Sequence, residues 1–159
     1  MNELENKRQK VIAACMAHQQ HIAAVAKQEM DSCQQQSNEY GANVDRYDSY
    51  RTKMMRQRDM YAKQLSNANA SLRALQPLQQ MAPFSSAEHG AIVITDKQKF
   101  FLSIGAGKFM VPYQAPTAMP QEVFFAVSAQ TPIFLALKGK GVGESITING
   151  ITQTIKEIY

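Results

Sequence analysis

The chain has 159 residues, of which 45% are hydrophobic and 19% charged, a composition typical of a soluble globular protein. Its net charge of +4 is too small to single out a nucleic-acid-binding protein. No apolar run approaches the ~20 residues that a membrane helix needs, and the charged first residues lack the apolar segment of a secretory signal. We therefore expect a cytoplasmic protein without a membrane partner.

Helix breakers are almost absent from the first half of the chain. All six prolines lie at position 77 or later, and Gly41 is the one glycine before residue 77. The pattern predicts an antiparallel coiled-coil hairpin over residues 1–76 with its tip near 37–48. Its seam residues recur at spacings of three, four or seven: Leu4, Val11, Cys15, His18, Ile22 and Val25 in the first arm, and Tyr47, Tyr50, Met54, Tyr61, Leu65, Ala68, Leu72 and Leu75 in the second.

The two cysteines, Cys15 and Cys33, both fall in the first of these helices. Along a helix that rises 1.5 Å per residue they are roughly 27 Å apart, which is too far for a disulfide within one chain. This spacing predicts two reduced thiols and agrees with a cytoplasmic location.

The second half of the chain reads as strands. After a linker at 77–90 come five β-like runs, a possible short helix at 131–138 and the dipeptide Asn149-Gly150, a strong hairpin signal. The glycines at 104–109, IGAGKF, predict a turn, because the full phosphate-loop pattern is absent. The fold class is therefore α+β: the hairpin followed by a small α+β domain over residues 91–159. The β-like runs are 91–95, 99–104, 122–127, 145–150 and 152–158.

The segment VSAQTPIFLALKGKGVGESITING, at 127–150, resembles the C-terminal domain of the Gre family of bacterial transcript cleavage factors. That family carries Ser-Pro-x-Ser-Pro, an apolar helix, and then Leu-x-Gly-Lys-x-x-Gly-Asp before a strand. Here Ala129 replaces the first proline and Glu144 the aspartate. The resemblance implies an FKBP-like fold for this domain. The order of hairpin, linker and domain is also that of the family, so the resemblance extends over nearly the whole chain. The matching positions are Ser128, Thr131, Pro132, Leu137, Gly139, Lys140 and Gly143.

The tip of the hairpin carries the second match. Gre factors begin their second helix with Asp-x-x-Glu, and this chain has Asp45-Arg-Tyr-Asp48. The resemblance implies that the tip enters the secondary channel of bacterial RNA polymerase, where Asp45 and Asp48 help to hold Mg²⁺ and assist cleavage of the 3′ end of backtracked RNA. Mg²⁺ prefers hard oxygen ligands, and two aspartates are too few to hold it well. The polymerase would complete the site, so we expect no enzyme activity from the chain alone and no small-molecule substrate.

Ordinary structural roles remain open for these residues. Asp45 can cap the second helix, and Asp48 can favour its first-turn dipole. Glu39 is either a third acid at the tip or a solvated loop charge. A basic strip behind the tip suits RNA phosphates, and equally suits a solvated helix face. We take the strip as a candidate nucleic-acid site of Arg46, Arg51, Lys53, Arg56 and Arg58.

Several functions compete at this point. The tip could stimulate cleavage, or the protein could occupy the channel and inhibit the polymerase, because Asp48 is one methylene shorter than the family's glutamate. A peptidyl-prolyl isomerase is disfavoured because the chain lacks tryptophan for an aromatic pocket, and fold alone does not carry function. A plain coiled-coil scaffold is a further alternative, under which the Gre-like motif at 127–150 would be a coincidence. For docking on the polymerase we take the region 128–137, with Ser128, Gln130, Thr131 and Pro132 as candidate contacts. Part of the apolar run PIFLAL must be core, so only its exposed residues can contribute.

Overall fold

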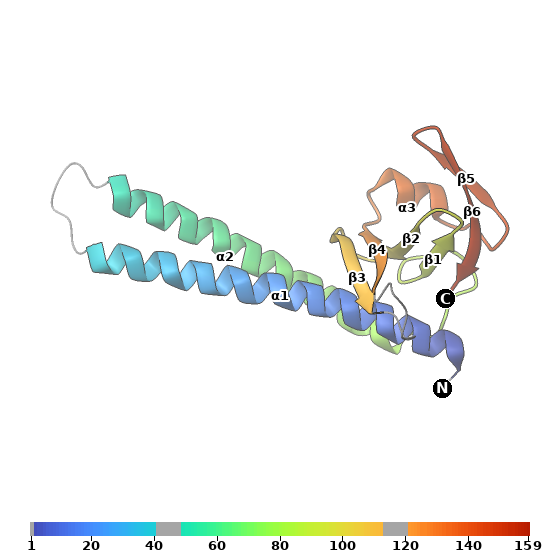
Figure 1. Ribbon diagram of the computed structural model, residues 1–159, viewed down its shortest axis with the longest axis horizontal. Coiled ribbons are helices and arrows are strands. Elements are labelled where there is room, and N and C mark those ends of the chain that lie inside the picture. Colours follow the sequence, from blue (N-terminus) through green and yellow to red (C-terminus); the bar gives the residue numbers. More distant parts are fainter. Residues whose placement is uncertain (1, 41–48, 113–120) are drawn as a thin grey trace. The chain divides into compact units, whose positions relative to one another are not determined.

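The computed structural model describes residues 2–40, 49–112 and 121–159 (Figure 1). Two long helices come first, followed by a 3₁₀ helix and then a six-stranded sheet. The class is therefore α+β, as the sequence predicts. The helices are α1 Glu3–Tyr40, α2 Ser49–Leu75, the 3₁₀ helix η1 Gln76–Gln80 and α3 Pro132–Leu137, and the strands are β1 Ile92–Thr95, β2 Lys99–Leu102, β3 Gly107–Pro112, β4 Gln121–Val127, β5 Ser145–Ile148 and β6 Ile151–Ile158.

The strands follow the order β3-β4-β2-β1-β6-β5. β2 and β4 pair in parallel, whereas the other neighbouring pairs are antiparallel. The β5–β6 turn confirms the hairpin signal, since Asn149 and Gly150 have φ of 54° and 77° and Ile148 pairs with Ile151. Positive φ at both central residues is the geometry of a tight type I′ turn, which Asn-Gly adopts readily.

Contacts divide the chain into two compact units. The sheet unit comprises residues 1–18 and 73–159, and the helical unit comprises residues 19–72. The first 18 residues thus belong by contact with the sheet, although the sequence pattern predicts that they belong to a hairpin ending at residue 76.

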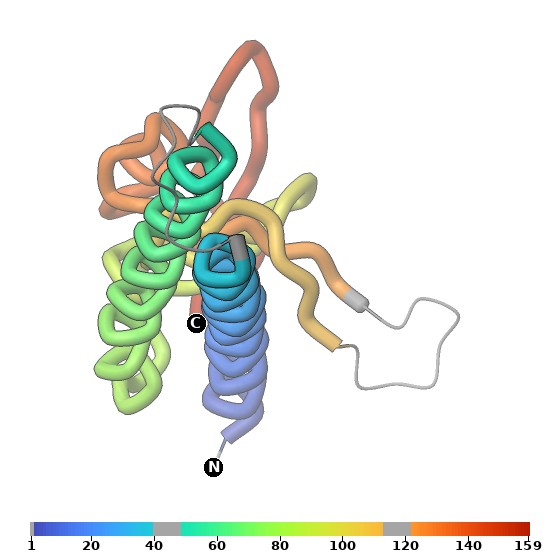
Figure 2. The backbone as a smooth tube through the Cα atoms, turned by 90° about the vertical axis from the view of Figure 1, so that its left-hand side faces the viewer, coloured from blue at the N-terminus to red at the C-terminus, as the bar shows by residue number. Residues whose placement is uncertain are grey.

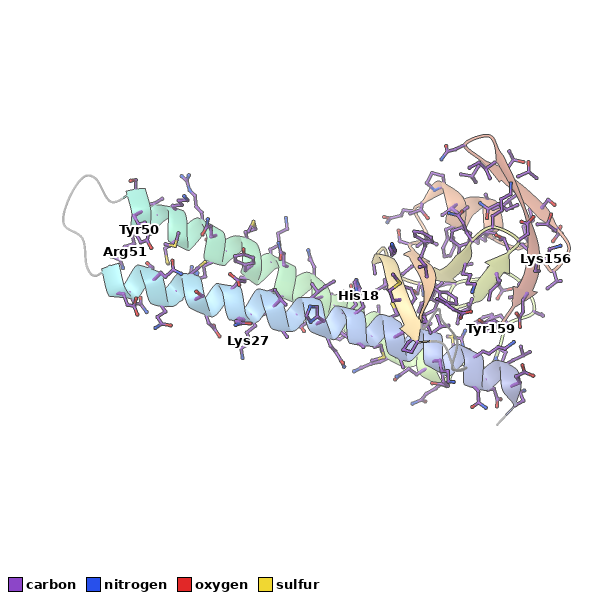
Figure 3. All side chains as sticks on the ribbon, in the orientation of Figure 1. His18, Lys27, Tyr50, Arg51, Lys156 and Tyr159 are labelled. Carbon is purple, nitrogen blue, oxygen red and sulfur yellow. The ribbon has the colours of Figure 1, made fainter. Side chains whose placement is uncertain are left out.

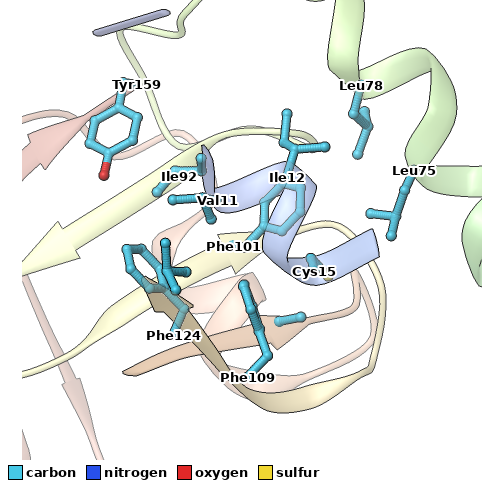
Figure 4. Close-up of a cluster of buried hydrophobic side chains, with 12 residues drawn as sticks. Val11, Ile12, Cys15, Leu75, Leu78, Ile92, Phe101, Phe109, Phe124 and Tyr159 are labelled. Carbon is cyan, nitrogen blue, oxygen red and sulfur yellow. The ribbon is translucent and has the colours of Figure 1, made fainter. Parts of the chain in front are cut away.

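The sheet unit has a hydrophobic cluster on each face of its sheet. Neighbouring residues of a strand point to opposite faces, so Phe101 joins one cluster and Phe100 the other. On one face, α1 and η1 cover the aromatic residues of the strands (Figure 4). On the other face, α3 covers Phe100 with Phe134 and Leu137. Full burial of each such side chain contributes about 1.5–3 kcal/mol, so these clusters dominate the stability of the unit.

Val11 and Cys15 therefore do not lie in a helix–helix seam of the helical unit. Both are buried in the cluster around Phe101 of the sheet unit. Their periodic spacing in the sequence correctly indicates one buried helix face, because a 3.6-residue period reports burial. It does not say which element covers that face, and here the cover is the sheet.

In the helical unit α1 and α2 lie side by side and run antiparallel (Figures 1 and 2). Gln36 accepts a hydrogen bond from Tyr50 at 3.3 Å, and further along Gln34 accepts one from Arg58 at 2.6 Å. Val25 and Tyr50, expected in the seam, are 42% and 40% exposed. The buried positions are small or polar for the most part: Gln19, Ala26, Cys33, Ser37, Met54 and Ala68.

Candidate functional site

The two predicted metal ligands, Asp45 and Asp48, lie outside the described residues, as does Arg46. Among residues 2–40, 49–112 and 121–159, no group of three or more His, Cys, Asp or Glu side chains is placed to hold a metal ion. Glu39 is exposed, and its carboxylate accepts a hydrogen bond from Gln35 of the same helix at 3.0 Å. Glu39 thus lies in the last turn of α1, where the sequence predicts a loop, and both of its roles stay predictions.

The basic strip divides between two faces of α2. At 100° per residue, Arg51 and Arg58 flank the buried side of Met54, and both are half-buried. Arg58 forms an ion pair with Asp59 at 2.8 Å in addition to its bond to Gln34. The Arg58 guanidinium thus has partners within the protein. It is less available to bind an RNA phosphate than the sequence predicts. Figure 3 shows Tyr50 and Arg51 in the first turn of α2.

Lys53 and Arg56 lie on the opposite, exposed face of α2. Lys63 shares this face, because it follows Arg56 by seven residues, about two helical turns. Within the described part of the chain none of the three forms an ion pair. We call Lys53, Arg56 and Lys63 the basic face. It is a row of free cations of the kind that contacts phosphates without reading base sequence.

The predicted docking residues are brought together at the start of α3. The Thr131 hydroxyl caps the helix by accepting from the Phe134 amide at 3.4 Å, and it donates to the Ser128 carbonyl at 2.8 Å. Pro132 occupies the first turn, where its missing N–H costs nothing. Thr131 therefore has a structural role, whereas Gln130 and Pro132 are exposed.

Two exposed apolar side chains follow this cap in the sequence. Leu135 lies within the predicted docking region 128–137, whereas Val142 lies outside it. Leu135 of α3 and Val142 of the following loop are each 61% exposed. The loop turns at Gly139 and Gly143, with φ of 81° and 91°, and the Glu144 carboxylate accepts from the Gly141 amide. We call Gln130, Pro132 and Leu135 the α3 patch. The signal for Leu135 was its place in PIFLAL, where Phe134 and Leu137 take the buried positions and Leu135 is left outside.

Arg8 is the one charged residue among the buried polar side chains of the described chain. Its guanidinium donates to the backbone carbonyls of Leu78 at 3.0 Å, Met81 at 3.2 Å and Gly90, and lies 5.1 Å from the centre of the Phe84 ring. Burial lowers the pKa of Arg8. The contacts join the start of α1 to η1 and the loop before β1, so Arg8 organises the sheet unit and is not a candidate for catalysis.

No family model, no curated protein and no solved structure matches this chain. In the described part of the chain no helix is long and apolar enough to cross a membrane.

Proposed function

We propose that the protein is a Gre-type transcription factor that binds bacterial RNA polymerase and assists Mg²⁺-dependent cleavage of backtracked RNA. The observation that carries the proposal is the order of parts: a helical region over residues 3–80, then a six-stranded sheet with the Gre-like motif at Ser128–Glu144. Under this proposal the helical unit, residues 19–72, is a coiled-coil hairpin with its tip near 37–48, and residues 91–159 form the FKBP-like domain.

Each surface has a role in this proposal. The α3 patch docks the protein on the polymerase, because exposed apolar side chains gain most from being covered. The basic face contacts RNA phosphates within the channel. Asp45 and Asp48 reach the polymerase active centre, where a bound Mg²⁺ would activate the attacking water and stabilise developing charge. The two aspartates supply oxygen ligands, the polymerase supplies the others, and the chain alone is not an enzyme.

The second candidate function is a regulator or inhibitor that occupies the secondary channel without cleavage. It is favoured by the sequence of the tip, where Asp48 is one methylene shorter than the glutamate of the family pattern. A shorter side chain carries its carboxylate less far, which could leave binding intact while cleavage is lost.

The test is the rate of RNA cleavage in a stalled elongation complex, with polymerase binding measured in parallel. We expect D45A and D48A to abolish the stimulated cleavage and to leave binding nearly intact. The control is Asp31→Ala, which removes an exposed carboxylate from α1. Unchanged cleavage in the D45A/D48A double variant would return both residues to capping roles. Absence of cleavage with the wild type, restored by D48E, would favour the regulator.

A further inference from the structure

A pocket in the sheet unit has no role in the proposed function. It has a volume of about 410 Å³, within the range of small-molecule sites. Its walls come from the start of α1 and from five of the six strands, so distant parts of the sequence build it. A hollow formed by several elements of a packed unit is a better candidate for a ligand site than a surface groove on a single helix.

The inner wall of the pocket is apolar. Val11 of α1 and Val111 of β3 are each 3% exposed, and both belong to the cluster that holds Phe101. Ile94 of β1 is half-buried and packs against the same cluster. The Tyr159 ring joins this wall, and Figure 4 shows it with Val11. A ligand would therefore bring an apolar body into contact with aliphatic side chains that the core already holds in place.

The remainder of the lining is charged and positive in balance. Lys7 pairs with Glu157 at 3.1 Å, and Lys99 pairs with Glu122 at 2.8 Å. Lys10 also lines the pocket, is exposed, and has no ion pair in the described residues. Among the side chains that line the pocket, three ammonium groups face two carboxylates, and Lys10 is the ammonium group that has no ion pair in the described residues. The lining thus offers a cation to a negative group beside an apolar wall.

From these two features we infer that the pocket binds a small amphipathic anion, an apolar body that carries one carboxylate or phosphate group. The apolar body lies against Val11, Ile94 and Val111, and the negative group binds Lys10. Binding requires both parts, because a single exposed ion pair is too weak to hold a small ligand by itself. RNA polymerase is not involved, so this inference stands or falls separately from the proposed function.

The probes are octanoate, octan-1-ol and inorganic phosphate, each titrated into the full chain and followed by NMR. Octanoate has both parts of the predicted ligand, whereas the alcohol lacks the charge and phosphate lacks the apolar body. We expect octanoate to shift the methyl signals of Val11, Ile94 and Val111 and to raise the melting temperature, because a ligand that binds only the folded state stabilises it. Equal binding of octan-1-ol or of phosphate overturns the inference, as does no octanoate binding.

Two variants with opposite expected effects test the charge. K10Q should raise the octanoate Kd about threefold. E157Q removes one carboxylate from the pocket lining and leaves Lys7 paired with Glu3 alone, so it should lower the Kd about threefold. The matched control is Lys156→Gln, which removes the same charge from an exposed position of β6 (Figure 3). Lys156 does not line the pocket. Any of three results overturns the assignment of the anion to Lys10: an unchanged Kd in K10Q, a higher Kd in E157Q, or a Kd change in the Lys156 variant equal to that in K10Q.

Discussion

The two compact units are stabilised by different kinds of side chain. The sheet unit buries phenylalanines and branched aliphatics on both faces of its sheet. The helical unit buries Ala26, Cys33, Ser37 and Ala68, with Met54 as the largest apolar side chain among its fully buried positions. Isolated helices gain most of their stability from packing of an apolar face. We therefore expect packing of the interior to stabilise the helical unit less than the sheet unit. The functional residues that we propose for the helical unit lie on its surface.

The largest effect should come from the aromatic core. Phe101→Ala in the sheet unit should lower the free energy of unfolding by about 4 kcal/mol, because the fully buried ring leaves a cavity that its neighbours cannot fill. Met54→Ala in the helical unit should cost no more than about 2 kcal/mol. Urea denaturation measures both changes. An equal cost for the two would contradict the difference between the units.

Loss of the Arg8 guanidinium should be the next largest effect. Arg8→Met keeps much of the side-chain volume but leaves the carbonyls of Leu78, Met81 and Gly90 without this donor, and should cost about 3 kcal/mol. Arg73→Met, at an exposed site in the last turn of α2, should change stability by less than about 0.5 kcal/mol. Chemical denaturation of the two variants side by side is the measurement. A small effect at Arg8 would mean that water replaces the guanidinium at these carbonyls.

Alkaline pH should weaken the sheet unit through Cys15. Burial raises the pKa of the Cys15 thiol from 9.0 to about 12. Above pH 9 the unfolded chain loses this proton while the folded chain keeps it, so stability present below pH 9 is lost as the pH rises toward 12. The slope is at most about 1.4 kcal/mol per pH unit. Burial also raises the pKa of Tyr159, and the hydrogen bond to Glu157 raises that of Lys7, which adds losses in the same direction above about pH 10.

Cys15→Ala and Cys15→Val distinguish titration of the Cys15 thiol from titration of other groups. Both remove the ionisable group, so both should flatten the fall in unfolding free energy between about pH 9 and pH 10, whatever they do to packing. The measurement is urea denaturation as a function of pH. A slope that persists in both variants would assign the alkaline loss to other groups.

The smallest predicted effect is a gain. The Ser37 hydroxyl is buried in the helical unit and has no hydrogen-bond partner in the described structure. Ser37→Ala removes that desolvated hydroxyl and should stabilise the protein by about 1 kcal/mol more than Ser66→Ala, its control on the exposed side of α2. Both substitutions give the same gain in helix propensity. The difference between their stability changes therefore measures the cost of burying the Ser37 hydroxyl. Equal shifts in melting temperature would show that Ser37 finds a partner.

Much of the secondary structure follows from the sequence. The runs at 91–95, 99–104, 122–127 and 145–150 each contain most of one strand, and the short helix lies inside 131–138. β3 is not among the predicted strands, because the glycines of IGAGKF predict a turn, whereas β3 spans Gly107–Pro112 and alternates exposed and buried residues from Lys108 onward. The alternation of Lys108, Phe109, Met110 and Val111 was the available signal.

The cover of α1 could not be predicted from periodicity. A helical period marks a buried face without naming its partner, so Val11 and Cys15 were assigned to a hairpin seam. In the same way the sequence pattern indicates only a polar break at Arg8, because its four carbonyl partners lie 70 or more residues away in the sequence.

The candidate site was predictable only in part. Lys53 and Arg56 are exposed, as a phosphate-binding face requires, whereas Arg58 has partners within the helical unit. Thr131 acts as a helix cap, and the structure adds that Leu135 is an exposed residue of the run PIFLAL within the predicted docking region. The aspartates at 45 and 48 stay a prediction.

The most direct test of the central proposal is binding of the full chain to bacterial RNA polymerase. We predict saturable binding that Leu135→Glu weakens at least about tenfold, because a charge then enters an apolar contact that the complex removes from water. Ile151→Glu places the same charge on another exposed apolar residue, 50% exposed in β6 and outside the α3 patch, and should leave the affinity unchanged. No binding by the wild-type chain, or equal losses in the two variants, would contradict the proposal that the α3 patch docks this protein on the polymerase.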